Sequence, residues 1–237
     1  MADLFHFKQF SIDQSGCAMK INTDGVLLGA LAEVNKPQAI LDIGTGTGVI
    51  ALMLTQRFPE AKIDAVEIDE TAAKTAASNF AKSQFVNRLT LFPSSFEQFF
   101  EANDDKHYNL IVSNPPFYIN SLHSPGAGKK LAKHADVDFF KNLISDAAKH
   151  LTAEGMFWLI LPVDTAELVK QLSIVNGLMI HHIINIRSYP ESKPHRQIIS
   201  FDRQQTNMFE TQFVIYDALK QYSGQYQTAL KDFFTIF

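Results

Sequence analysis

Short apolar runs alternate with longer amphipathic stretches from Ala39 onward along the chain. The apolar runs predict strands that are buried on both faces, a pattern typical of parallel sheets. These runs are Ala39–Ile43, Lys62–Glu67, Leu89–Phe92, Leu110–Ser113 and Met156–Leu161. The stretches with apolar residues at helical spacing are Gly48–Arg57, Glu70–Lys82 and Asp138–Leu151. This alternation predicts an α/β fold, a doubly wound and mostly parallel sheet with helices on both faces.

The remainder of the chain predicts one more helix, a hairpin and a terminal helix. Asp164 and Glu167 have the spacing of a capping box at a helix start, and Gly177 marks the expected end of that helix. Leu178–Ile186 and Gln197–Phe201 have no helix between them, so we expect an antiparallel hairpin at the sheet edge. The residues that fit a final helix packed on the body are Tyr226, Leu230, Phe233 and Phe234.

Composition favours a soluble globular enzyme with one domain over residues 1–237. Apolar residues make up 46% of the 237 residues, which is enough for a substantial core. No apolar run reaches the roughly 18 residues needed to span a bilayer, and the first ten residues lack the apolar core of a signal peptide. Cys17 is the only cysteine, so an internal disulfide is excluded and a reducing cytoplasm is favoured.

Charge gives a weaker indication. The net charge of −4 argues mildly against non-specific binding of nucleic acid by the whole surface. It still allows a local basic face, because cations gather in residues 124–134 and 187–203. The sequence does not reveal the oligomeric state.

A glycine-rich turn follows the first predicted strand and opens the first predicted helix. Its glycines are Gly44, Gly46 and Gly48, which permit a sharp turn and let a ligand approach where a Cβ would collide. The spacing differs from the G-x-G-x-x-G of dinucleotide sites. Glu67 ends the second strand, where its carboxylate can accept hydrogen bonds from both hydroxyls of a ribose. Together they predict a site for a nucleoside cofactor.

Asn114-Pro115-Pro116-Phe117 follows the fourth predicted strand at its carboxyl end, where open α/β sheets bind ligands. The Asn114 side-chain oxygen and the Pro115 carbonyl can accept hydrogen bonds from an amino group on a flat ring. Both contacts stabilise the positive charge that grows on that nitrogen when it attacks an electrophile. The prolines fix the backbone, and Phe117 offers a face on which an extruded base can stack. The tetrapeptide therefore predicts methyl transfer to a planar nitrogen, without a metal ion.

These residues resemble those of the class I S-adenosylmethionine-dependent methyltransferases. The resemblance implies a Rossmann-like fold with a seven-stranded sheet and S-adenosylmethionine as the cofactor. It also implies that Glu67 holds the ribose and that Asp42 and the glycine turn flank the methionine part. An acidic residue usually contacts the adenine, and this chain has Ser95 near that position. The implied cofactor residues are Asp42, Gly44, Thr45, Gly46, Gly48, Glu67, Ile68, Ser95 and Asn114.

Further stretches narrow the resemblance, which spans nearly the whole chain. The Asn-Pro-Pro-Phe loop is similar to that of enzymes acting on adenine N6, guanine N2 or a glutamine amide. Phe7–Phe10, Cys17–Ala30, Pro194–Arg196 and Tyr222–Leu230 resemble the bacterial tRNA (adenine-N6)-methyltransferases that modify valine tRNA beside the anticodon. This family implies tRNA as the partner and the adenosine at position 37 as the methylated residue.

The same resemblance implies roles at both ends of the chain. Residues 1–38 form an extension that closes over the cofactor site. The extension residues implied to close over the cofactor are Lys20, Thr23, Asp24 and Gly25. Alternatively, Thr23–Gly25 caps a helix over Val26–Leu31, and both roles can hold. The RNA-binding candidates are Lys129, Lys130, Lys133, His134, His195 and Arg196.

Other functions fit the sequence less well. Guanine-N2 methyltransferases of ribosomal RNA commonly carry a similar second domain in front, and only residues 1–38 precede the first predicted strand. Glutamine methyltransferases of release factors need an N-terminal helical domain, and DNA adenine methyltransferases usually insert a target-recognition domain. A non-catalytic module that binds the cofactor and RNA is disfavoured by the intact Asn114.

Overall fold

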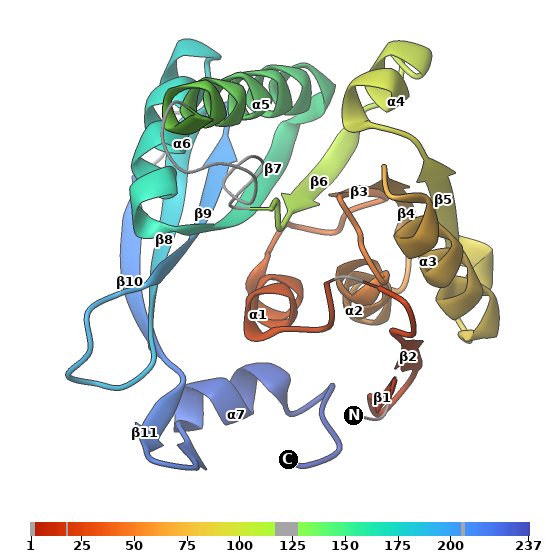
Figure 1. Ribbon diagram of the computed structural model, residues 1–237, viewed down its shortest axis with the longest axis vertical. Coiled ribbons are helices and arrows are strands. Elements are labelled where there is room, and N and C mark those ends of the chain that lie inside the picture. The colour runs from red at the N-terminus through yellow and green to blue at the C-terminus, as the bar shows by residue number, and fades with distance from the viewer. Residues whose placement is uncertain (1–2, 18, 117–127, 205–206) are drawn as a thin grey trace.

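The computed structural model describes residues 3–17, 19–116, 128–204 and 207–237, with the side chains of residues 128–136 left aside (Figure 1). Within these residues the central sheet has eight strands in the order β10-β8-β9-β7-β6-β3-β4-β5. Their bounds are β3 Ala39–Ile43, β4 Lys62–Glu67, β5 Leu89–Pro93, β6 Tyr108–Ser113, β7 Leu151–Pro162, β8 Met179–Arg187, β9 Arg196–Asp202 and β10 Phe209–Val214. All neighbouring pairs are parallel except the two that β9 makes with β7 and β8.

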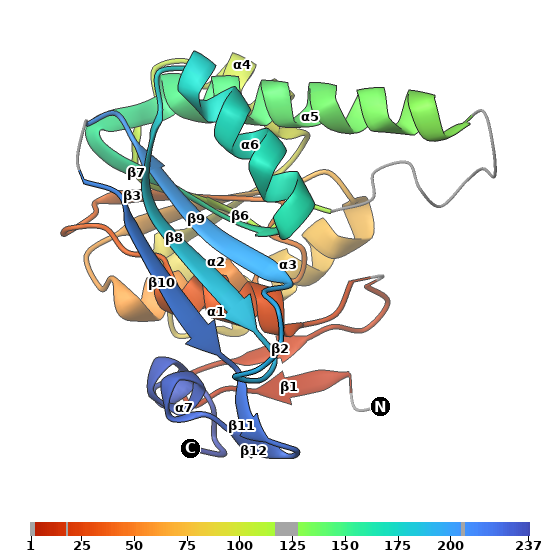
Figure 2. The ribbon, with the colours of Figure 1, turned by 90° about the vertical axis from the view of Figure 1, so that its left-hand side faces the viewer.

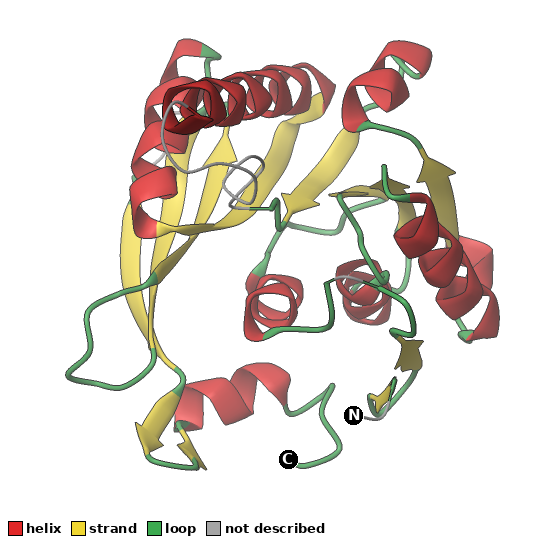
Figure 3. Ribbon diagram, viewed as in Figure 1, coloured by secondary structure: helices red, strands yellow, loops and turns green. Residues whose placement is uncertain are grey.

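Helices cover both faces of this sheet (Figure 3). The helices that pack into one hydrophobic core are α1 Thr23–Leu31, α2 Val49–Arg57, α3 Glu70–Lys82 and α7 Gly224–Leu230. Those that pack into the core on the opposite face are α4 Phe96–Ala102, α5 Gly128–His150 and α6 Val163–Val175. A short 3-10 helix covers Val86–Arg88 before β5. The doubly wound, Rossmann-like α/β class predicted from the sequence is confirmed.

Two small hairpins lie outside the main sheet. β1 (Leu4–His6) pairs antiparallel with β2 (Ser11–Asp13), and β11 (Tyr216–Ala218) pairs antiparallel with β12 (Gln221–Tyr222). The first hairpin lies close to α7 and to both chain termini (Figure 2). No described helix combines the length and apolar character needed to cross a membrane.

The sheet edge differs from the expectation of seven strands ending in a hairpin. β8 and β9 do form the expected antiparallel hairpin, but β10 pairs parallel to β8 and becomes the edge strand. The prediction missed β10 because its first four residues are exposed. An edge strand of this kind lacks the continuous apolar run by which buried parallel strands are found.

Two helix boundaries also differ from the prediction. Helix α6 begins at Val163 after Pro162 and has no side-chain cap, so the predicted capping box is wrong. Glu167 instead forms an ion pair with Lys170 at 2.6 Å. Gly177, with φ of +71°, follows the end of α6 as expected. Helix α7 ends at Leu230, and the two predicted phenylalanines beyond it are buried in the turns that follow.

Candidate active site

The glycine turn between β3 and α2 adopts backbone angles that favour glycine. Gly44, Gly46 and Gly48 have φ values of +72°, +58° and +86°. The N–H groups of Gly44 and Thr45 donate to the Val66 carbonyl at 2.9 and 3.0 Å, which fixes the turn against β4. A Cβ on Gly44 or Gly46 would meet nothing within 4 Å, so these two positions face open space. The turn is thus a cradle that a ligand can approach closely.

Asp42 braces the turn from behind. Its side chain is fully buried and accepts hydrogen bonds from the Thr45 hydroxyl at 2.6 Å and the Ala51 N–H at 3.2 Å. Burial raises the pKa of Asp42 to about 7, and these two hydrogen bonds oppose that rise only in part. Asp42 does not line the neighbouring cavity. In this structure Asp42 holds the turn through these hydrogen bonds, and its predicted place beside the methionine part of the cofactor stays a prediction.

Glu67 stands at the carboxyl end of β4, 8% exposed. One carboxylate oxygen accepts from the Gly46 N–H and the other from the Asp69 N–H, both at 2.8 Å. A carboxylate has about four acceptor positions, so two remain for a ligand. Its position agrees with the sequence expectation of a carboxylate facing a ribose.

A cavity of about 430 Å³ lies between the glycine turn and the loop after β6. This volume is within the usual range for pockets that bind small molecules and cofactors. Of the predicted cofactor residues, six line its wall: Gly44, Gly46, Glu67, Ile68, Ser95 and Asn114. Strand-end positions from β3, β4 and β6 therefore meet in one place, as expected for adjacent parallel strands.

The catalytic loop begins where β6 ends. The Ser113 hydroxyl donates to the Ile43 carbonyl at 2.9 Å, which ties the loop to β3. Asn114, Pro115 and Pro116 follow and line the cavity. Among the described residues, no hydrogen bond engages the Asn114 carboxamide. Phe117 lies outside the described residues, so its predicted stacking role stays a prediction.

The extension residues lie near the cavity but are held by other protein groups. Lys20 pairs with Asp3 at 3.0 Å, and Thr23 lines a separate hollow beside α7. The Asn22 side chain accepts from the Gly25 N–H at 2.9 Å, so Asn22 rather than Thr23–Gly25 caps α1. A Cβ on Gly25 would lie 3.7 Å from Asn114 Nδ2, which places the first turn of α1 against the catalytic loop.

Asp24 and Arg196, predicted to contact cofactor and RNA respectively, form an ion pair with each other. Arg196 Nε donates to Asp24 Oδ2 at 2.8 Å, and the two side chains are 27% and 17% exposed. The pair links the start of α1 to the start of β9. His195 is next to it, and burial together with Arg196 lowers the pKa of this imidazole. The side chains of Lys129, Lys130, Lys133 and His134 lie outside the described part of the chain.

Some cavity residues escaped the sequence prediction. Cys17 and Met19 line the cavity from the extension, and Phe96 and Phe139 line it from α4 and α5. Phe139 belongs to the apolar stripe of α5, so its spacing predicted only a core position. Ser95 lines the cavity and also caps α4, because its hydroxyl accepts from the Gln98 N–H at 3.2 Å.

Comparison with known proteins agrees with this geometry. The family model described as "Methyltransferase small domain" matches residues 19–166. The chain belongs to this family. The methyltransferase is 47% identical over 238 residues to a tRNA1(Val) (adenine(37)-N6)-methyltransferase of Pedobacter heparinus, with all of both chains covered. A protein of that name from Bacteroides thetaiotaomicron is 38% identical, covering 97% of this chain and 96% of that protein.

Solved structures support the fold of the methyltransferase. A predicted O-methyltransferase from Agrobacterium tumefaciens superposes with a TM-score of 0.66 at 15% identity, covering 89% of this chain and 96% of that one. A putative RNA methyltransferase from Pyrococcus horikoshii gives a TM-score of 0.52 at 18% identity, with coverage of 78% and 81%. At such identities the likeness concerns the fold alone.

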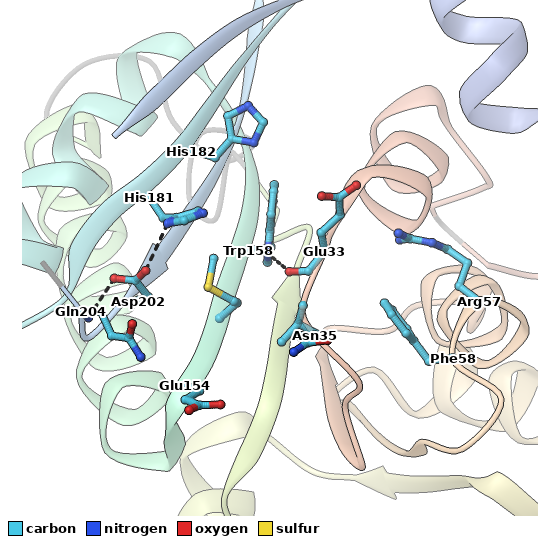
Figure 4. Close-up of a pocket in the computed structure, with 12 residues that line it drawn as sticks. Glu33, Asn35, Arg57, Phe58, Glu154, Trp158, His181, His182, Asp202 and Gln204 are labelled. Atoms are coloured by element: carbon cyan, nitrogen blue, oxygen red, sulfur yellow. Dashed lines mark hydrogen bonds and ion pairs between the residues drawn. The ribbon is translucent and has the colours of Figure 1, made fainter. Parts of the chain in front are cut away.

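The methyltransferase has a larger hollow, of about 570 Å³, at the opposite end of the strands, where β7 and β8 begin (Figure 4). His181 pairs with Asp202 there at 3.2 Å, and Trp158 Nε1 donates to the Glu33 carbonyl at 2.9 Å. Glu33, Glu154 and Asp202 line this hollow together with the cationic Arg57 and the imidazoles of His181 and His182. None of the site residues predicted from the sequence lies in it. The described residues include no group of three or more potential ligands that could hold a metal ion.

Proposed function

We propose that this methyltransferase transfers a methyl group from S-adenosylmethionine to N6 of the adenosine at position 37 in valine tRNA. The observation that carries the proposal is the meeting of Asn114-Pro115 with the glycine turn and Glu67 around one cavity. The names of the two tRNA1(Val) relatives support the substrate. We also propose the cytoplasm as the place of the reaction, because its tRNA substrate is found there.

The cavity suits the cofactor. The open space at Gly44 and Gly46 would admit its amino-acid part close to the backbone, and Glu67 would accept hydrogen bonds from the ribose hydroxyls. Ser95 and the apolar wall from Phe96 would face the adenine. When bound, S-adenosylmethionine supplies a methyl group activated by its sulfonium charge.

Asn114 and Pro115 would hold the target amine. The exocyclic nitrogen of adenine is a poor nucleophile because its lone pair is delocalised into the ring. Two acceptors, Asn114 Oδ1 and the Pro115 carbonyl, favour the pyramidal nitrogen and stabilise its developing positive charge. Pro116 restricts the backbone that carries them. The extension would enclose the site, since Cys17 and Met19 line the cavity beside this loop.

The tRNA would approach over the carboxyl ends of the parallel strands, where the catalytic loop lies. Phe117 would stack on the extruded adenine, as aromatic side chains do with flipped bases. The cations and imidazoles that we propose to face the tRNA are Lys129, Lys130, Lys133, His134, His195 and Arg196. Arg196 would do so while it pairs with Asp24.

Labelled S-adenosylmethionine and valine tRNA transcript test the proposal. We expect N6-methyladenosine at position 37 after digestion to nucleosides, and no product from a transcript with guanosine there. Asn114→Ala should lower single-turnover rates by about 10²–10³-fold while cofactor affinity stays near normal. The matched control is Asn35→Ala, because Asn35 is an exposed asparagine at the opposite end of the strands. A different methylated nucleoside, or a wild-type rate for Asn114→Ala, would refute the assignment.

A further inference from the structure

Tyr189 is the outer member of a row of four aromatic rings. Its ring centroid lies 5.7 Å from that of Tyr216, which lies 5.1 Å from Tyr222, which lies 4.7 Å from Tyr226. Tyr226 is buried against the core at 4% exposure, whereas Tyr189 is 36% exposed. The row therefore presents a supported aromatic ring to solvent.

The loop that carries Tyr189 is fixed by hydrogen bonds. The Tyr189 N–H donates to Ser192 Oγ at 2.9 Å, and the Ser192 N–H donates back to the Tyr189 carbonyl at 3.0 Å. Arg187 Nη1 donates to the Ser192 carbonyl at 3.3 Å, and the Tyr216 N–H donates to the Ser188 carbonyl at 2.9 Å. Because the ring is held in place before any ligand binds, its use as a contact surface costs little conformational entropy.

The surroundings of this ring are basic. Arg187, Lys193 and Arg196 lie in the segment from β8 to β9, against the single carboxylate Glu191. Arg196 is matched by Asp24, and Glu191 offsets one further positive charge, so Arg187 and Lys193 leave this segment with a net excess of one positive charge. Arg187 donates to neutral acceptors, and Lys193 is exposed. An exposed aromatic ring beside excess positive charge is the combination with which proteins bind single-stranded nucleic acid.

The ring also lies at the same end of the parallel strands as the catalytic loop. Tyr189 follows the carboxyl end of β8 and Asn114 follows that of β6, with β9 and β7 between them. Three strand spacings amount to about 15 Å across the sheet, and the register sets Tyr189 about five residues, or roughly 16 Å, further along the strand direction than Asn114. The two residues are thus about 22 Å apart, which a few nucleotides can span. The Asp24–Arg196 pair joins the start of β9 to α1, and a Cβ on Gly25 in the first turn of α1 would lie 3.7 Å from Asn114 Nδ2.

We propose that Tyr189 stacks on an unpaired base of the tRNA anticodon loop near the methylated adenosine, with Arg187 and Lys193 facing the adjoining phosphates. This inference rests on the proposed function and adds a second contact for its substrate. Unpaired loop bases are recognised in this way because their faces are free to stack on aromatic side chains.

Binding of an anticodon stem-loop RNA to Tyr189→Leu and Tyr189→Phe tests the stacking. Tyr189→Leu should weaken affinity roughly 5- to 100-fold, the usual range for one lost base–aromatic stack, while Tyr189→Phe stays within twofold of wild type. The matched control is Phe209→Leu, because Phe209 is an exposed aromatic residue at the start of β10, at the opposite end of the strands from Tyr189. Wild-type affinity for Tyr189→Leu would overturn the proposal.

The salt dependence of RNA binding distinguishes the contribution of the Tyr189 ring from that of the cations. The slope of log affinity against log salt should be unchanged in Tyr189→Leu, because stacking releases no counterions. It should fall by about one in Lys193→Ala. Lys62→Ala, an exposed lysine at the start of β4, should change neither affinity nor slope. An unchanged slope in Lys193→Ala would refute the phosphate contact.

RNAs with a single abasic nucleotide in the loop test the same contact from the side of the RNA. At one loop position the missing base should weaken wild-type binding by about the same factor as Tyr189→Leu does, and should weaken Tyr189→Leu little further. Equal abasic effects in both proteins at every position would overturn the proposal. Methylation of the intact RNA by wild type is measured in parallel, and its absence would count against the proposed function instead.

Discussion

Gly48→Ala should destabilise the protein through two separate costs. The residue has φ of +86°, and placing an L-residue in this left-handed region costs about 1–2 kcal/mol. Its new Cβ would also lie 2.5 Å from Cε1 of Phe80, a core ring that is 4% exposed. Overpacking of this kind costs about 1–3 kcal/mol. The unfolding free energy should therefore fall by about 2–5 kcal/mol.

Gly46→Ala is the matched comparison in the same turn. Its φ of +58° carries the same kind of strain, but its Cβ would meet no atom within 4 Å. Its stability loss should be about 1–2 kcal/mol. The added methyl would enter the space proposed for the cofactor, so Gly46→Ala should lose cofactor affinity by about tenfold or more.

Calorimetric melting and cofactor titration measure both effects. In a chain of this size each kcal/mol lowers Tm by about 2–4 °C, so Gly48→Ala should melt about 4–20 °C below wild type. Gly46→Ala should melt at most about 8 °C below wild type. Equal Tm values for the two variants would refute the argument from Phe80. Unchanged cofactor affinity in Gly46→Ala would remove the turn from the cofactor site.

Glu67→Ala should weaken the cofactor by about 1.5–3 kcal/mol through lost charge-assisted hydrogen bonds, and calorimetric affinity within twofold of wild type would contradict this. Because burial raises the pKa of Asp42 from 3.8 to about 7, the stability it contributes is full below pH 4 and lost as pH rises through 7. Asp42→Asn should thus show a smaller fall in unfolding free energy between pH 5 and 8 in urea titrations, and an equal fall would count against this. Asp24→Asn and Arg196→Gln should each slow methylation several-fold, with a coupling of about 1 kcal/mol in a double-mutant cycle; additive effects would mean that the pair is not functional. Replacing Lys129, Lys130 and Lys133 by alanine should flatten the salt dependence of tRNA binding, and an unchanged slope would place the RNA contacts elsewhere.

The helices and strands that the sequence predicted most accurately are those whose pattern comes from burial. β3, β4 and α3 have the predicted bounds because a strand covered on both faces, or a helix with one apolar face, leaves a continuous pattern. The strand-end rule then placed Glu67 and Asn114 at one cavity. The exposed β10 left no such pattern.

Long-range contacts could not be predicted in the same way. Asp24 and Arg196 are 172 residues apart, and neither residue type reveals its partner. Lys20 likewise bonds Asp3 through the fold of the extension. Phe139 has the spacing of any core residue, and only the approach of α5 to the β6 loop places it at the cavity.

The pairing of the two chain ends bears on when the enzyme matures. Phe7 forms a β-bridge with Phe234, the Lys8 N–H donates to the Phe233 carbonyl at 2.7 Å, and the Lys8 ammonium donates to the Phe237 carbonyl at 3.0 Å. The segment that leads to Cys17 and Met19 at the cavity wall is thus held by residues made more than 200 positions later. Contacts between positions so far apart in the sequence form only after the intervening chain has been made and has folded. The glycine turn needs only β3, β4 and α2, so the wall that Cys17 and Met19 give to the cavity is completed later in folding than the turn itself.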